Sequence, residues 1–112
     1  MKITTHSRFP GRPGKRLTLF MSVHDHVRHN SLEMELLKRS RKAKLAGATV
    51  FEGDEGFGAS GHVHREHLLG DDRPLAVVFI DEPEKIDAFL DQVSPLLHDV
   101  VVTVDDIELL DL

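Results

Sequence analysis

One stretch decides the fold: Leu75-Ala76-Val77-Val78-Phe79-Ile80, followed at once by Asp81-Glu82-Pro83. A continuous apolar run of this length is typical of a central, well-buried strand. Asp81 or Glu82 is suited to cap a helix, and proline is favoured in the first turn of a helix. The stretch therefore predicts a central strand that leads directly into a helix.

Periodic apolar patterns on the N-terminal side of this stretch predict two more strands and a helix. Alternating side chains over residues 17–23 predict a first strand, and Ala48-Thr49-Val50-Phe51 predicts a second. Apolar residues between these two segments recur at helical spacing. Asn30 with Glu33 forms a capping-box-like start for this helix, and Gly47 is expected to end it in left-handed backbone.

The C-terminal side predicts a second helix and the remaining strands. Apolar residues over 86–97 follow helical spacing, and Pro95 is expected to loosen or stop that helix. Residues 100–104 predict a fourth strand, and residues 107–110 predict a short, acidic C-terminal edge strand. The order β-α-β-β-α-β is that of the ferredoxin-like sandwich of the α+β class, with both helices on one face of a single sheet. The opposite sheet face then lacks cover, so we expect an oligomer.

Composition limits the chain to one ordinary domain. It has 112 residues, of which 40% are hydrophobic, and it has no cysteine, which excludes disulfides and thiolate metal sites. Its apolar runs are too short to cross a bilayer, and no apolar segment follows Lys2, so no secretory signal is expected. These features predict a cytoplasmic location.

Charge is distributed unevenly along the chain, whose net charge is −5. We predict a flexible basic N-terminal arm at residues 1–16 and an ordered domain at residues 17–112. The arm either contacts an anionic surface or acidic partner, or is a solvated start before an acidic face. The acidic domain has no tyrosine or tryptophan and argues against nucleic-acid binding. The cations of the arm are Lys2, Arg8, Arg12, Lys15 and Arg16.

Four glycines lie close together in the middle of the chain, at Gly53, Gly56, Gly58 and Gly61. They predict backbone conformations or close approaches that a Cβ would forbid. Consecutive backbone amides in such a segment can cradle a phosphate or a carboxylate. The spacing matches neither the Walker A motif nor the dinucleotide-binding fingerprint. A mobile loop or a β-bulge without a ligand is the alternative interpretation.

The glycine-rich segment and the stretch quoted first also resemble a known family. Residues 46–61, His64, Arg73-Pro74-Leu75 and residues 81–86 resemble the bacterial and archaeal family called domain of unknown function 190. The resemblance covers about residues 17–110 and implies the fold of the PII signalling proteins, which are trimers with ligand clefts between ferredoxin-like subunits. Family members usually have a Gly-Glu-Ser-like turn after the first strand. This chain has Ser-Val-His-Asp-His at residues 22–26, so no ligand contact is assigned to that turn.

The resemblance implies a homotrimeric signalling module that binds an adenine nucleotide, or a similar anion, between subunits; no other cofactor is expected. Backbone amides of Gly56, Gly58 and Ala59 are expected to hold phosphate, with Arg39, Lys42 or Arg65 completing the charge. The loop after the second strand is expected to relay ligand binding to a target protein. The candidate ligand-binding residues are Gly53, Gly56, Phe57, Gly58, Ala59, Ser60, His64, Arg39, Lys42 and Arg65.

Histidines recur twice at the spacing H-x-H-x-x-H. The first and second strands are expected to run parallel and to end at the same edge of the sheet, which would bring both triplets together. Imidazoles beside Asp25 or Glu66 suit zinc, copper or nickel. The alternative is that polar loops simply carry histidines, and no metal ligand is assigned. The triplets are His24, His26 and His29, and His62, His64 and His67.

The residues indicate binding rather than catalysis. Ser60 near His62 lacks a nucleophile-elbow context, and Asp54 with Glu55 is a commonplace pair of loop acids. The preferred hypothesis is the PII-like nucleotide-binding trimer. Two alternatives remain open. One is a structural or regulatory subunit of a membrane transporter, by analogy with PII proteins, and the other is a divalent-metal-binding protein that uses the histidine clusters.

Overall fold

The computed structural model describes residues 8–57, 63–65 and 73–112. No helix within these ranges is both long and apolar enough to cross a membrane. In chain order the elements are β1 (Gly11–Ser22), β2 (His26–Val27), β3 (Asn30–Ser31), α1 (Leu32–Lys42), β4 (Gly47–Glu52), β5 (Glu55–Phe57), β6 (Val63–Arg65), β7 (Pro74–Asp81), α2 (Pro83–Val93), the 3-10 helix η1 (Ser94–Leu96) and β8 (Val101–Leu110).

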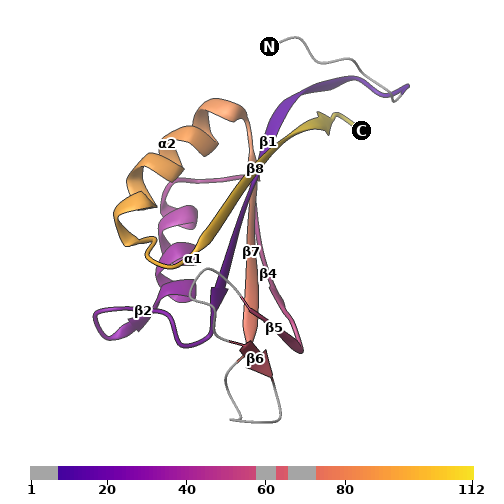
Figure 1. The fold of residues 1–112 in the computed structure, drawn as a ribbon. Helices are drawn as coiled ribbons and strands as arrows, with labels where there is room; N and C mark the ends of the chain where they lie inside the picture. Colours follow the sequence, from indigo (N-terminus) through magenta and orange to yellow (C-terminus); the bar gives the residue numbers. More distant parts are fainter. Residues whose placement is uncertain (1–7, 58–62, 66–72) are drawn as a thin grey trace.

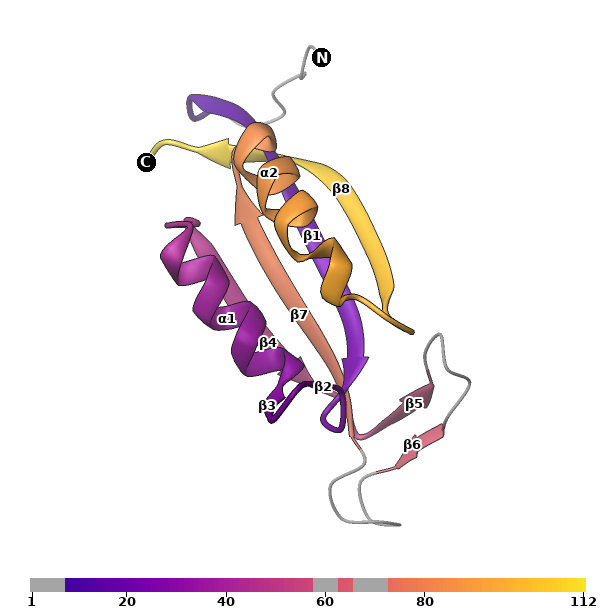
Figure 2. The ribbon, with the colours of Figure 1, turned by 90° about the vertical axis from the view of Figure 1, so that its left-hand side faces the viewer.

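The main sheet has the strand order β4-β7-β1-β8, and every neighbouring pair is antiparallel. Each α-helix connects two strands that run in the same direction, α1 between β1 and β4, and α2 between β7 and β8. Both helices lie on the same face of the sheet (Figures 1 and 2). The α+β class and the ferredoxin-like topology predicted from the element order are therefore confirmed.

The core lies between the helices and the sheet face that they cover. Alternate residues of β1, Leu17, Leu19 and Met21, are buried on this face because successive strand side chains point to opposite sides. The rings of Phe79 in β7 and Phe89 in α2 pack with centroids 4.9 Å apart and an interplanar angle of 54°. Tilted ring pairs of this kind are favourable beyond their buried area. The other core residues are Leu32, Leu36, Leu75, Val77, Ile86 and Val93.

Strand β1 begins inside the segment that the sequence analysis assigned to the arm. Residues 11–14 pair with residues 107–110 of β8 and extend beyond β7 as a two-stranded ribbon (Figure 1). Gly14 permits this approach, because a Cβ there would lie only 2.7 Å from Cγ of Leu109. Pairing with β8 thus overrides the turn signal of a segment rich in proline and glycine. The ordered sheet includes residues 11–16.

Cations of this ribbon are paired within the chain. Arg12 donates to the carboxylate of Asp111 at 2.6 Å, and Lys15 donates to Asp87 of α2 at 2.8 Å. The hydrogen bond to Asp87 and its negative charge raise the pKa of Lys15 against a smaller desolvation effect. Arg12 and Lys15, which were predicted to be available to an external acidic partner, therefore have acidic partners within the chain.

Helix α1 begins and ends at other residues than those predicted. Ser31 rather than Asn30 is the N-cap, and its hydroxyl accepts the N–H of Met34 at 3.1 Å. At the other end Lys44 takes the left-handed conformation, with φ of 59°, and a Schellman pair of hydrogen bonds closes the helix. Gly47, which was expected to end the helix, begins β4.

Strand β8 is one continuous strand, whereas the sequence predicted two pieces. Asp105 and Asp106, which lie between the two predicted pieces, pair with Arg16 and Lys15 of β1, so these acids face cations within the strand. Opposite charges across a strand pair are stabilising. The predicted edge position is confirmed, because β8 is the last strand in the sheet order.

Candidate ligand site

Strands β1 and β4 end on either side of the first residues of β7. Ser22, the last residue of β1, pairs with Pro74, and Glu52, the last residue of β4, pairs with Leu75. The expectation that these two strands run parallel and end at one edge of the sheet is confirmed. We call this edge, where residues 22–23, 52–53 and 73–75 meet, the loop end. Figure 2 shows the segments that follow β1 and β4 leaving the sheet there.

Gly53 allows the backbone to pass close to Pro74. A Cβ on Gly53 would lie 2.9 Å from Cγ of Pro74, and a proline ring cannot turn aside as a flexible chain can. The N–H of Gly53 donates to the carbonyl of Pro74 at 2.9 Å. Gly53, a candidate ligand-binding residue, therefore has a packing role here, and its N–H is occupied by Pro74 rather than free for a ligand.

A short hairpin follows Gly53 at the loop end. Strands β5 and β6 pair antiparallel, with Gly56 opposite His64 and Phe57 opposite Val63. Four candidate ligand residues, Gly56, Phe57, His64 and Arg65, are thus brought together on one hairpin. The candidates Gly58, Ala59 and Ser60 lie outside the described residues.

The segment after β1 is organised by Asp25. Its carboxylate accepts the N–H of Ser22 at 2.8 Å, and its carbonyl accepts the N–H of Leu32 at 2.8 Å. Among the described residues, no three His, Asp or Glu side chains are placed to hold a metal ion. The meeting of the two histidine triplets stays a prediction, because His62 and His67 lie outside the described residues while His24, His26 and His29 are exposed.

Two candidate cations on α1 lie far from the loop end. Arg39 donates to Glu35 one turn earlier at 2.9 Å, and Lys42 is the last residue of the helix. The segment that follows α1 is tied to the far end of β7. The N–H of Ala46 donates to Asp81, the last residue of β7, and Lys85 donates to the carbonyl of Lys44. At about 3.4 Å per residue, the eight residues of β7 separate its two ends by roughly 24 Å. A single chain therefore does not bring Arg39 and Lys42 to the glycine-rich segment.

Arg73 lies at the loop end, although the sequence analysis did not assign it to the site. Its Nη1 donates to Oε2 of Glu52 at 3.1 Å, and its Nε is buried with no hydrogen-bond partner in the described part of the chain. A signal was present in the sequence, since an arginine that directly precedes Pro74 and the buried strand has to lie where that strand begins. Arg73 was interpreted only as part of the family motif Arg73-Pro74-Leu75, so its position beside the site was not predicted.

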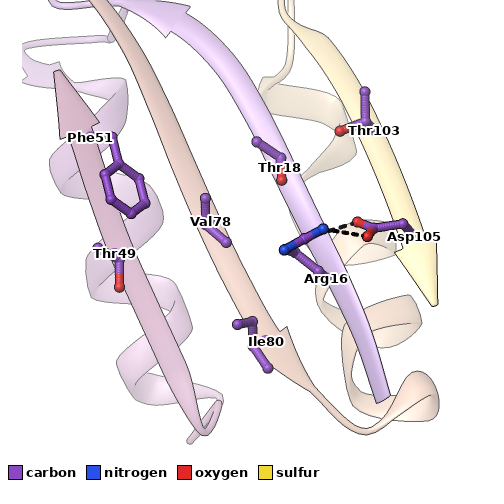
Figure 3. Close-up of a pocket in the computed structure, with 8 residues that line it drawn as sticks. All are labelled: Arg16, Thr18, Thr49, Phe51, Val78, Ile80, Thr103 and Asp105. Atoms are coloured by element: carbon purple, nitrogen blue, oxygen red, sulfur yellow. Dashed lines mark hydrogen bonds and ion pairs between the residues drawn. The ribbon is translucent and has the colours of Figure 1, made fainter. Parts of the chain in front are cut away.

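No element of the described residues covers the sheet face opposite the helices, and we call it the uncovered face. Phe20 and Phe51 lie on it and keep 42% and 58% of their surface exposed. A shallow groove of about 420 Å³ crosses all four strands beside them (Figure 3). Directly paired residues share a face, so side chains cross the sheet in rows. One row is Phe51, Ala76, Phe20 and Val101, and the next is Thr49, Val78, Thr18 and Thr103.

An ion pair borders this groove. Nε and Nη2 of Arg16 donate to the two carboxylate oxygens of Asp105 at 3.0 and 2.6 Å (Figure 3). The hydrogen bond from Arg16 and its charge lower the pKa of Asp105, and the same contact raises the pKa of Arg16. Both side chains are about half exposed, so the pair adds little stability. Because the charges cancel, the groove is suited to cover by a protein surface rather than to anion binding.

Comparisons with known proteins agree with this architecture. The model of the family DUF190, described as Uncharacterized ACR, matches residues 14–109. A UPF0166 protein of Aquifex aeolicus (strain VF5) is 32% identical over 98 residues, which cover 86% of this chain and 92% of that protein. Both matches span nearly the whole sheet and both helices.

Solved PII-like proteins share the fold. The nitrogen regulatory PII-like protein CPII from Thiomonas intermedia K12, bound to ADP, AMP and bicarbonate, has a TM-score of 0.72 at 20% identity over 92% of this chain and 93% of that one. A putative PII-like signaling protein from Thermus thermophilus has a TM-score of 0.63 at 16% identity over 88% of this chain and 90% of that one. At these identities the likeness shows the fold alone. By family match and by architecture, the chain belongs to the DUF190 family and has a PII-like fold.

Proposed function

We propose that the chain is a homotrimeric PII-like module that binds an adenine nucleotide, or a similar anion, between its subunits. The observation that carries this proposal is the uncovered sheet face with its exposed Phe20 and Phe51. A contiguous apolar face of this kind is usually buried against another protein surface. A second and third copy of the chain are the partners that the PII-like fold favours.

The ligand is proposed to lie at the loop end. Arg73, which directly precedes β7, provides positive charge there. CPII, whose fold this chain shares, was solved with ADP, AMP and bicarbonate. Because Arg39 and Lys42 lie at the opposite end of β7, any contact that they make with the ligand has to come from a neighbouring subunit. The segment after β4 is then proposed to relay the bound state to a target protein, without catalysis.

Size-exclusion chromatography with light scattering tests the assembly. Wild-type protein is expected to have three times the monomer mass of 12.6 kDa. Replacing Phe20 and Phe51 by Asp should yield monomers, because burying two unpaired charges in an interface is costly. Met34, which is 62% exposed on α1 and outside the uncovered face, provides the control substitution Met34→Asp. A monomeric wild type at micromolar concentration would refute the trimer.

Calorimetric titration with ATP, ADP and AMP at about 0.15 M salt tests the ligand, since surface electrostatics are exaggerated at lower salt. At least one of the three is expected to bind, and GTP serves as the control for base recognition. Thermal denaturation with each nucleotide provides a second readout, because a ligand that binds only the folded state raises the midpoint. No heat and no thermal shift with any of the three would remove the nucleotide proposal and leave the assembly proposal standing.

A further inference from the structure

An arginine is held where β1, β4 and β7 meet. Arg73 directly precedes β7, and its carbonyl accepts the N–H of Val23, which follows β1, at 3.1 Å. Its side chain reaches in the other direction, where Nη1 donates to Oε2 of Glu52, the last residue of β4, at 3.1 Å. Arg73 is therefore held at the loop end by both strands that flank β7, through its backbone to the segment after β1 and through its guanidinium to β4.

One donor of this guanidinium is not used. Nε of Arg73 is buried and has no hydrogen-bond partner among the residues that the structure describes. Buried N–H groups in folded proteins are nearly always paired, and an unpaired one calls for an explanation, such as an ion or ligand. Other arginines of this chain use the same atom, since Nε of Arg16 donates to Asp105 at 3.0 Å and Nε of Arg39 donates to Glu35 at 2.9 Å.

The existing partner of Arg73 is a weak competitor. The side chains of Arg73 and Glu52 are 29% and 49% exposed, and ion pairs with this much solvent contact add little stability. An anion that approaches Arg73 meets the repulsion of the Glu52 carboxylate. Once the side chain turns from Glu52 and brings Nε to the surface, the same anion offers Nε the acceptor that it lacks. Glu52 and an incoming anion therefore compete for one cation.

We propose that Arg73 binds an oxyanion through its Nε–H, and that Glu52 opposes this binding. The oxyanion is either a phosphate group of the bound nucleotide or a small carboxylate such as bicarbonate, because the planar guanidinium suits both. The inference rests on the proposed function and names the residue that holds the anion. Binding shifts Arg73 from Glu52 toward the ligand, so the occupied state is communicated to the residue at which the chain leaves β4.

The test uses the full chain and two substitutions with opposite expected effects. Arg73→Gln should weaken anion binding by about tenfold or more, the size of a charge-assisted hydrogen bond. Glu52→Gln should strengthen it several-fold, because it removes the competing charge and keeps a similar shape. Arg41→Gln and Asp91→Asn are controls on exposed helix positions and should bind like wild type. ADP, inorganic phosphate and bicarbonate are titrated separately, with circular dichroism to check folding.

The outcomes separate this inference from the proposed function. Loss of ADP and phosphate binding in Arg73→Gln identifies a phosphate ligand, and loss of bicarbonate binding alone identifies a carboxylate ligand. Affinities for ADP, phosphate and bicarbonate that all equal wild type in both Arg73→Gln and Glu52→Gln would overturn the role of Arg73 and leave the proposed function intact. If no probe binds wild-type protein, both are refuted. Should Arg73→Gln fail to fold, unchanged affinity in Glu52→Gln is sufficient to overturn the inference.

Discussion

The carboxylate of Asp81 accepts a hydrogen bond from the backbone N–H of Ala46 at 2.9 Å and so ties the last residue of β7 to the segment before β4. The same carboxylate accepts the N–H of Glu82 at 2.6 Å, and the ammonium of Lys85 lies 3.4 Å away. Lys85 also donates to the carbonyl of Lys44 at 2.8 Å. Asp81, itself buried, thus joins the end of α1, the start of β4 and the first turn of α2 in one cluster.

Replacing Asp81 by Asn should lower the free energy of unfolding by about 1–3 kcal/mol, the cost of leaving partly buried donors poorly paired. The amide can accept only one of the two backbone N–H bonds well, and it no longer attracts Lys85. Urea unfolding followed by circular dichroism measures the change. The control Asp91→Asn lies at an exposed position of α2 and should stay within about 0.5 kcal/mol of wild type. Equal unfolding midpoints for Asp81→Asn and wild type would show that the cluster is dispensable.

Acid should remove the contribution of Asp81. Burial alone would raise its pKa, but the N–H groups of Glu82 and Ala46 and the charge of Lys85 outweigh that effect and lower it below 3.8. A depressed pKa in the folded state means stability that is fully present above the unfolded pKa and lost as pH falls through the folded value. Wild-type stability should therefore fall more steeply below pH 3.8 than that of Asp81→Asn. Parallel acid denaturation curves would contradict this assignment.

Gly53→Ala should destabilise the chain, whereas Gly47→Ala should not. The new Cβ at residue 53 would lie 2.9 Å from the ring of Pro74, but the one at residue 47 finds its nearest atom at 4.0 Å. We expect a loss of about 1–3 kcal/mol at residue 53, typical of overpacking, and a change within about 1 kcal/mol at residue 47. Thermal unfolding of both variants compares them directly. A similar loss in the two would mean that contact with Pro74 is not the reason for a glycine.

Two N-terminal truncations should behave differently. Removing residues 1–9 leaves β1 intact and should shift the midpoint of thermal unfolding by no more than about 2 °C. Removing residues 1–15 deletes the start of β1 with its β8 pairing and the Lys15–Asp87 contact, and should lower the midpoint by more than about 5 °C. If deletion of residues 1–15 leaves the midpoint of thermal unfolding unchanged, the whole segment is a dispensable arm, as the sequence predicted.

Much of the fold could be predicted from the periodic spacing of apolar residues alone. The run from Leu75 to Ile80 predicted the central strand β7, and the helical stripes predicted α1 and α2 because strand and helix periods are local properties of the backbone. Boundaries were less accurate. Asn30 and Ser31 are neighbouring capping residues, and the choice between them depends on β3, which only the folded chain forms. Lys44 takes a left-handed conformation, which cannot be predicted from the identity of a lysine side chain.

The candidate site was only partly predictable. Gly56 and His64 do lie opposite each other, because the hairpin is a local structure whose strands are close in sequence. Arg39 and Lys42 were chosen for their charge, yet α1 runs from the loop end toward the other end of β7 and carries them away from it. Arg73 was overlooked because a buried Nε without a partner is a property of tertiary contacts.

By itself, the sequence determined which residues face inward, the order of the elements and the membership of a PII-like fold. These follow from the spacing of apolar side chains and from a long motif, both of which can be recognised in the linear sequence. Only the tertiary structure decided which charges meet. Arg16 lies against Asp105, Arg12 against Asp111, and Arg73 against Glu52, each pair distant in sequence. Such partners depend on strand order and register, which are fixed only when the whole sheet forms and packs against the helices.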